Sequence, residues 1–209
     1  MIRFFLCNLL FLALSFSGFA QSFKGGVTAG FVVSQVSGDN LSGFNKPGAL
    51  SGAYIFLEPS AKWRMELQMI HFMKGSYDPI RPDKGDFYSY SMTLHYIELP
   101  LIFRYYYKKL WWGAGLSQGY LASSRLKNQD GLFPAGSPDA RPFKKMETSA
   151  NLAVLWPFSE RFEIEARFNQ SLLPIRNHLG NTVFRFNRGQ YNTALAACVR
   201  IRLGKITKP

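Results

Sequence analysis

Apolar and polar residues alternate along most of the chain with a period of two. In the clearest stretch, 161–169, aromatic and aliphatic residues alternate with Arg, Glu and Asn. A longer stretch, 190–203, alternates in the same way. Successive side chains of a strand point to opposite faces, whereas a helix repeats every 3.6 residues, so this period predicts β-strands.

Eight strands are expected from this alternation. In the fourth, the alternation shifts near Tyr96 and Pro100 lacks a backbone donor, which together predict a β-bulge. The expected strands are 23–36, 47–57, 63–74, 88–106, 110–124, 146–157, 161–169 and 190–203.

The segments between the strands differ in length in a regular way. Three are short turns, at 58–62, 108–109 and 157–160, and Trp63, Trp112 and Trp156 lie close to them. The others are long and polar, and are interpreted as extracellular loops at 37–46, 75–87, 125–145 and 173–189. Short periplasmic turns, long outer loops and aromatic girdles are typical of bacterial outer-membrane barrels.

The fold class expected is therefore all-β: an eight-stranded antiparallel transmembrane up-and-down β-barrel with short periplasmic turns and longer extracellular loops. A soluble barrel is the alternative, and it would turn its apolar faces inward. The aromatic girdle and the strand lengths favour the membrane barrel, because crossing a bilayer takes about 9–11 tilted residues.

The N-terminus has the features of a secretory signal peptide. Arg3 precedes an apolar run, and small residues at Gly18 and Ala20 suit cleavage after Ala20. The run is short for a spanning helix, which is the alternative interpretation. The expected organisation is a cleaved signal peptide at 1–20, the barrel at 21–204 and a short basic C-terminal tail at 205–209. The expected location is the outer membrane of a Gram-negative bacterium.

Composition adds limited information. The 209 residues carry a formal net charge of +12, and aromatic residues make up 16%. Cys7 lies within the signal, so Cys198 is alone in the mature chain and an internal disulfide is excluded. A basic balance can indicate nucleic acid, anionic lipid or acidic partners. An exported barrel does not meet nucleic acid, so we predict no nucleic-acid partner.

If the apolar faces contact lipid, the charged faces must point into the barrel. A lumen of eight strands is filled by side chains, and buried charges need partners, so a closed network of ion pairs is expected. A purely structural role is favoured over a path for ions or solutes. The predicted lumen residues are Arg64, Glu66, Gln68, Glu98, Arg104, Arg161, Glu163, Glu165, Arg167, Arg200 and Arg202.

Three segments resemble the PorT-like outer-membrane β-barrel family, which is common in Bacteroidota. They are 25–30 (GGVTAG), 43–48 (GFNKPG) and, most specifically, 96–101 (YIELPL). The resemblance implies an eight-stranded barrel without catalytic residues. It also implies a link to the type IX secretion system, gliding or outer-membrane assembly machinery.

Catalytic and metal-binding motifs are absent from the sequence. His71, His95 and His178 share no short motif with a nucleophile, although Ser76 follows His71 by five residues, and no Gly-x-Ser-x-Gly occurs. No spacing fits a metal site or a phosphate-binding loop. We therefore predict no enzyme, no cofactor and no metal; a lipid A-modifying enzyme is a distant alternative.

Basic residues in the third and fourth long loops are candidates for contacts with lipopolysaccharide or a protein partner, because Arg grips phosphate in a fork. An accessory subunit of a larger secretion or assembly complex is the first hypothesis, and a free-standing structural or lipopolysaccharide-contacting barrel is the second. The candidates are Arg125, Lys127, Arg141, Lys144, Lys145, Arg176, Arg185 and Arg188.

Overall fold

The computed structural model describes residues 23–39, 43–85, 87–129, 131–132, 142–177 and 189–203. These residues form eight long strands, two short strands and one short 3-10 helix, η1. The long strands are β1 (Lys24–Ser37), β2 (Lys46–Ser60), β3 (Trp63–Asp78), β4 (Tyr90–Tyr107), β5 (Leu110–Asn128), β7 (Met146–Pro157), β8 (Phe162–Ser171) and β10 (Gly189–Leu203). The short elements are β6 (Gly131–Leu132), β9 (Arg176–Asn177) and η1 (Pro82–Lys84).

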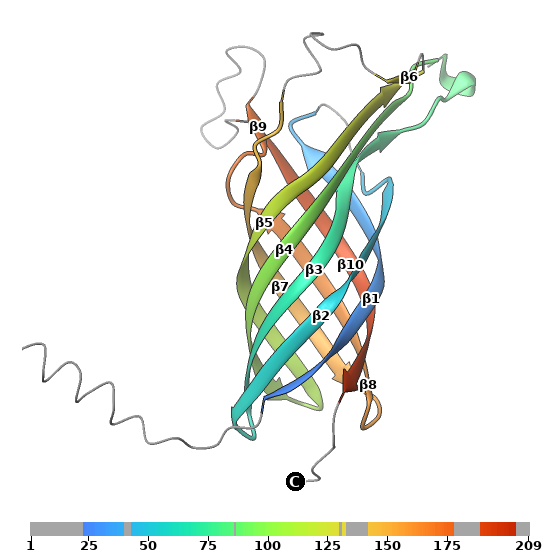
Figure 1. Ribbon diagram of the computed structural model, residues 1–209. Helices are drawn as coiled ribbons and strands as arrows, with labels where there is room; N and C mark the ends of the chain where they lie inside the picture. Colours follow the sequence, from blue (N-terminus) through green and yellow to red (C-terminus); the bar gives the residue numbers. More distant parts are fainter. Residues whose placement is uncertain are drawn as a thin grey trace, which may run out of the picture.

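The long strands close into a ring (Figure 1). Each pairs antiparallel with the next long strand, and β10 returns to β1 with a register from Gly25 opposite Leu203 to Ser37 opposite Tyr191. Closure leaves no free sheet edge around the barrel. The expected antiparallel up-and-down barrel of eight strands is confirmed.

Short turns join β2 to β3, β4 to β5 and β7 to β8 at one rim, where β1 begins and β10 ends (Figure 1). The turn between β4 and β5 has two central residues, Lys108 and Lys109, with φ of 48° and 66°. Positive φ at both positions is the geometry that follows the right-handed twist of a tight hairpin. The predicted short turns therefore lie where the sequence placed them.

A β-bulge occurs beside Tyr96, but on β5 and not on β4. His95 lies opposite Ser123 while Tyr96 lies opposite Leu121, which leaves Ala122 as the additional residue. β4 itself alternates without a shift, so that prediction is wrong. The sequence suggested a shift because the inward residues of β4 change from charged to apolar near the outer end of the barrel.

Strands β3, β4 and β5 continue past the ring. β2 pairs with β3 only as far as Phe72, and β7 pairs with β5 only as far as Tyr120. Beyond them, residues 73–78, 90–95 and 121–128 form a three-stranded extension, joined by β6, which we call the ledge (Figure 1, upper right). The predicted loops 75–87 and 125–145 therefore begin as strands.

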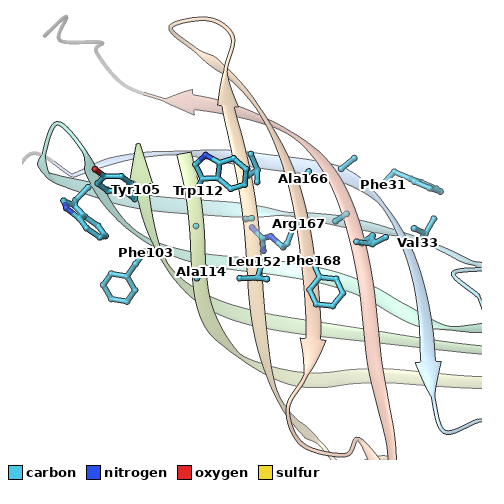
Figure 2. Close-up of a pocket in the computed structure, with 17 residues that line it drawn as sticks. Phe31, Val33, Phe103, Tyr105, Trp112, Ala114, Leu152, Ala166, Arg167 and Phe168 are labelled. Carbon is cyan, nitrogen blue, oxygen red and sulfur yellow. The ribbon is translucent and has the colours of Figure 1, made fainter. Parts of the chain in front are cut away.

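The outer face of the ring is apolar. Aromatic and aliphatic side chains from every long strand are exposed, among them Trp112, Leu152 and Val199. A shallow apolar groove crosses this face where Ala114 and Ala166 lie between larger side chains (Figure 2). So much exposed apolar surface needs a non-aqueous surrounding, as the bilayer supplies. Among the described residues, no helix is long and apolar enough to cross a membrane.

We predict that Leu152→Arg destabilises the membrane-inserted barrel by about 2–4 kcal/mol, because it places a charge on the lipid face of a spanning strand. The matched control is Leu132→Arg on β6, since the two leucines are 59% and 66% exposed but only Leu152 lies on the ring. Folding into vesicles is measured by the heat-dependent shift in gel mobility. Equal losses in the two variants would contradict the proposed position of the membrane.

Candidate functional site

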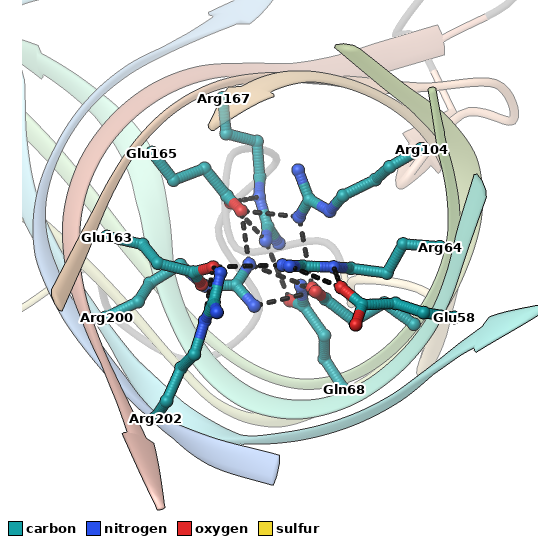
Figure 3. Close-up of polar contacts among 10 residues, drawn as sticks. Glu58, Arg64, Gln68, Arg104, Glu163, Glu165, Arg167, Arg200 and Arg202 are labelled. Atoms are coloured by element: carbon teal, nitrogen blue, oxygen red, sulfur yellow. Dashed lines mark hydrogen bonds and ion pairs between the residues drawn. The ribbon is translucent and has the colours of Figure 1, made fainter. Parts of the chain in front are cut away.

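A cluster of buried charges lies inside the ring, toward the end that carries the short turns, and Figure 3 shows these side chains pointing toward one another across the lumen. The inward positions of β3, β4, β8 and β10 bring them together, because alternate residues of each strand point to the lumen. The cluster contains Arg64, Glu66, Gln68, Arg104, Glu163, Glu165, Arg167 and Arg200, all at most 3% exposed.

Two carboxylates and two guanidinium groups form the centre of this cluster. Glu66 accepts hydrogen bonds from Arg104 at 3.0 Å and from Arg200 at 2.7 Å. Glu165 accepts from the same two arginines, each at 2.5 Å, and also from Arg167. Each charge thus has opposite charges on two sides, which offsets the cost of removing it from water.

Aromatic rings, together with a glycine that leaves space for an arginine, complete the packing of the cluster. The Arg200 guanidinium lies 3.8 Å from the centroid of Tyr54, a cation–π geometry. Gly113 leaves room for Arg104, since a Cβ there would lie 3.0 Å from the Arg104 Cγ. The Arg64 guanidinium carbon lies between the rings of Phe56 and Trp111, 4.2 Å and 4.4 Å from their centroids.

The cluster reaches the rim through a second set of ion pairs. Glu163 accepts from Arg64 at 3.0 Å and from Arg202. Glu58 accepts from Arg64 at 2.8 Å and from Lys24 at 2.9 Å. Lys24 and Glu58 are partly exposed, so this end of the network meets solvent.

A smaller polar cluster lies nearer the outer end of the barrel. Lys74 Nζ lies 2.6 Å from Glu98 Oε1 and 3.1 Å from Glu147 Oε1, and it donates to Asn169 at 2.7 Å. Ser171 and Asn192 also donate to Glu147. Sequence reasoning missed Lys74 and Glu147, although continuing the alternation of Arg64, Glu66 and Gln68 by three more inward positions reaches Lys74.

Apolar side chains close the outer mouth. Val36, Met92, Leu94, Tyr96, Leu121 and Ile175 form one buried cluster, with Leu126 and Phe143 packed against it. A second apolar cluster includes Val32, Ile70 and Phe72. The expectation of a closed interior fits the described residues, but the ion pairs do not fill it alone, because inward positions near the mouth carry apolar residues.

Ten of the eleven predicted lumen residues lie inside the barrel, with Arg202 partly exposed at its rim. The prediction for Arg161 is wrong. Arg161 is exposed, because β8 begins one residue later at Phe162 and Arg161 belongs to the preceding turn.

The predicted outer contacts divide into three groups. Arg125, Lys127, Lys144 and Lys145 are exposed. Arg176 is 5% exposed, donates to Gln190 at 2.9 Å and lies over the Phe143 ring, so its prediction as an outer contact is wrong. The remaining three, Arg141, Arg185 and Arg188, lie outside the described residues, as do the signal peptide and the basic tail.

Two histidines meet on the outer face. His71 Nε2 and His95 Nδ1 are 2.9 Å apart and their rings stack. Ser76 is buried, on the opposite side of β3 from His71, so the two form no nucleophile–base pair. His178 lies outside the described residues. Within the described ranges, no three His, Cys, Asp or Glu residues are placed to hold a metal ion.

Three comparisons place the chain among known proteins. No curated protein matches the sequence. The fold is similar to Neisserial surface protein A (TM-score 0.51, 13% identity, 88% of this chain and 100% of that one). It is also similar to Ail of Yersinia pestis (0.47, 10%, 86% and 98%) and OprG of Pseudomonas aeruginosa (0.37, 10%, 88% and 95%).

The family comparison is the most informative of the three. A family model described as "Outer membrane protein beta-barrel domain" matches residues 17–177, which is more than half of the chain. With the closed ring, the apolar outer face and the filled lumen, this match shows that the chain belongs to the outer membrane protein β-barrel family and resides in the outer membrane of a Gram-negative bacterium.

Proposed function

We propose that this chain is a non-conducting, non-catalytic barrel that serves as an accessory subunit of a larger outer-membrane secretion or assembly complex. The observation that carries the proposal is the ledge, a hydrogen-bonded sheet extension that projects beyond the apolar face from a barrel whose lumen is filled. The barrel holds the protein in the outer membrane in a fixed orientation, and the ledge contacts the partner protein.

A filled lumen supports a role other than transport. The Arg–Glu cluster occupies the end near the short turns, Lys74 with its two carboxylates lies farther out, and the apolar cluster around Tyr96 closes the mouth. An ion would have to break paired buried charges and then cross an apolar layer. Both steps carry large desolvation costs.

Exposed apolar residues support the docking role. Ile80, Phe87 and Tyr88 lie in the connection between β3 and β4, and Phe87 and Tyr88 are 65% and 73% exposed. Leu132, on β6, is exposed as well. Apolar side chains that project into water beyond the membrane are a feature of protein interfaces, whose centres are enriched in aromatic residues.

The PorT-like assignment belongs to this proposal. The most specific segment, 96–101, contributes Tyr96 to the mouth cluster and Glu98 to the ion pair with Lys74, while Leu99 and Leu101 face outward. Each part of the motif thus has a place in closing or embedding the barrel. A type IX secretion complex or the barrel-assembly machinery is the partner class that the resemblance suggests.

A second candidate function is that of a free-standing barrel that contacts lipopolysaccharide. The observation that favours it is the exposure of Arg125 and Lys127 on the outer side of the ledge, just beyond the apolar face. Guanidinium and ammonium groups at that level suit the phosphates of outer-leaflet lipid.

We predict that the purified barrel gives no unitary ion currents in planar bilayers. The combined variant Lys74→Ala with Tyr96→Ala removes one member of the polar layer and one of the mouth cluster, and tests whether those layers form the barrier. Regular channel openings in the unaltered protein would contradict the proposed closed state.

We predict that Glu66→Gln destabilises the barrel by about 3 kcal/mol, because Arg104 and Arg200 lose a buried counter-charge. Glu58→Gln is the comparison variant. It should lower the stability of the barrel less than Glu66→Gln, since the Glu58 side chain is 24% exposed. Urea unfolding of vesicle-inserted protein gives both values. A loss for Glu66→Gln no larger than that for Glu58→Gln would show that the central cluster is not a main source of stability.

We predict that gentle detergent extraction of tagged protein recovers a large outer-membrane protein at stoichiometric yield, retained through a salt wash and identified by mass spectrometry. Ile80→Ser with Phe87→Ser should lose it. Phe158→Ser, an exposed aromatic at the opposite rim, should retain it. A clean monomer from the unaltered protein would exclude a stable complex and leave the free-standing barrel.

A further inference from the structure

The His71–His95 pair lies at the boundary between the apolar outer face and the polar ledge. Below it on β4, the outward residues Ile97, Leu99 and Leu101 are apolar and exposed. Above it on β4, the outward residues are Thr93 and Ser91, while β3 carries Met73 and Tyr77 on the same side. A boundary of this kind on the outer end of a barrel lies at the level of the outer-leaflet headgroups.

Cationic groups surround the histidines. Arg125 of β5 lies opposite Thr93, diagonally next to His95 on the same outer face, and Lys127 lies opposite Ser91, one outward position farther. From the β2 side, Lys46 Nζ donates to Ser91 Oγ at 3.1 Å, although Lys46 is only 8% exposed. Burial, followed by the neighbouring groups His71, Arg125 and Lys46, lowers the pKa of His95.

This set of charges has no counter-charge among the described residues. None of the ion pairs of those residues includes Lys46, Arg125 or Lys127. Asp78, the carboxylate at the end of β3, is paired with Arg81 at 2.5 Å. Gathered like charges repel, so a bound anion would relieve a repulsion that the described residues do not offset.

The histidine pair adds a proton-dependent component. One ring nitrogen of a neutral pair donates to the other across 2.9 Å, so at most one of the two contacting nitrogens carries the proton. A protonated imidazole offers donors on both nitrogens and adds positive charge. An anion that bridges the rings to Arg125 therefore favours protonation, and protonation favours the anion.

We propose that His71, His95, Lys46 and Arg125 form a binding site for a phosphate group of an outer-leaflet glycolipid, with tighter binding when the histidine pair is protonated. Arg125 supplies the forked guanidinium donors, and Lys46 supplies an ammonium group. The two imidazoles make the affinity for phosphate depend on pH. The site deepens the second candidate function above and rests on it. Its location on the outer face makes a lipid-borne phosphate the ligand, with free phosphate as the alternative source.

The test uses the full barrel folded into phosphatidylcholine vesicles that contain either lipid A with its phosphates or enzymatically dephosphorylated lipid A. Lipid that remains bound after detergent extraction is quantified by native mass spectrometry at pH 8 and pH 6.5. The unaltered protein should retain phosphorylated lipid A about tenfold better, the size of one charge-assisted hydrogen bond. Retention should also rise between pH 8 and pH 6.5, because the bound phosphate opposes the burial and the neighbouring cations that lower the pKa of His95, and so favours protonation of the pair.

The variants separate the parts of the site. Lys46→Gln with Arg125→Gln should remove the preference for phosphorylated lipid A at both pH values. His71→Gln with His95→Gln should keep part of the preference but lose its rise at pH 6.5. Lys62→Gln with Lys108→Gln, at the opposite rim, is the control and should match the unaltered protein, as should the gel mobility of every variant.

Each opposite outcome has a definite meaning. A preference that survives Lys46→Gln with Arg125→Gln would overturn this site while leaving lipopolysaccharide contact in place. No preference in the unaltered protein would overturn both. A pH response that persists in the double histidine variant would overturn the role of the imidazoles, and displacement of the lipid by millimolar inorganic phosphate would overturn the lipid assignment.

Discussion

The paired charges at the centre of the lumen are the interaction on which the rest of the barrel depends. Glu66 and Glu165 are bridged by Arg104 and Arg200, and these four residues come from β3, β8, β4 and β10. A lumen this narrow holds side chains in contact, so an unpaired charge there would cost several kcal/mol. The ring can close only in a register that brings each carboxylate to its arginines.

The polarity of the inward-facing and outward-facing residues changes at the membrane boundary. Within the ring, outward residues are apolar and the charged residues face inward, beside an apolar layer near the mouth; in the ledge, Met92 and Leu94 face inward while Thr93 and Arg125 face outward. β4 makes this change in polarity without a shift in its alternation. β5 makes it with the bulge at Ala122, which turns Leu126 toward the mouth cluster. The boundary between the two patterns marks where lipid gives way to water.

This change in polarity gives the two proposed roles, docking of a protein partner and contact with lipopolysaccharide, a common structural basis. A lumen filled at several levels supports the proposed role of the barrel as a membrane anchor. Strands β3–β5 continue without a break from the barrel into the ledge. The His71–His95 pair lies at the level of this change, where headgroup phosphates and solvent protons are both accessible. Contacts with a protein partner and with lipid would therefore use different parts of the same extension.

The sequence by itself determined the strands, the two faces and the turns, because a period of two assigns every residue of a strand to one side or the other. It correctly placed Glu66 and Arg200 inside and Trp112 outside. The exact ends of the strands were beyond it, so Arg161 was assigned to the lumen although it lies in a turn, and Lys74, at the end of the predicted third strand, was missed.

Only the tertiary structure decided which residues meet. Arg200 and Glu66 are 134 positions apart, and Arg64 and Glu163 are 99 positions apart. Alternation fixes the face of a residue but not its height in the ring, which depends on how the strands are staggered when β10 closes on β1. The burial of Arg176, the bulge on β5 and the contact of His71 with His95 depend in the same way on how neighbouring segments are aligned, which no local pattern records.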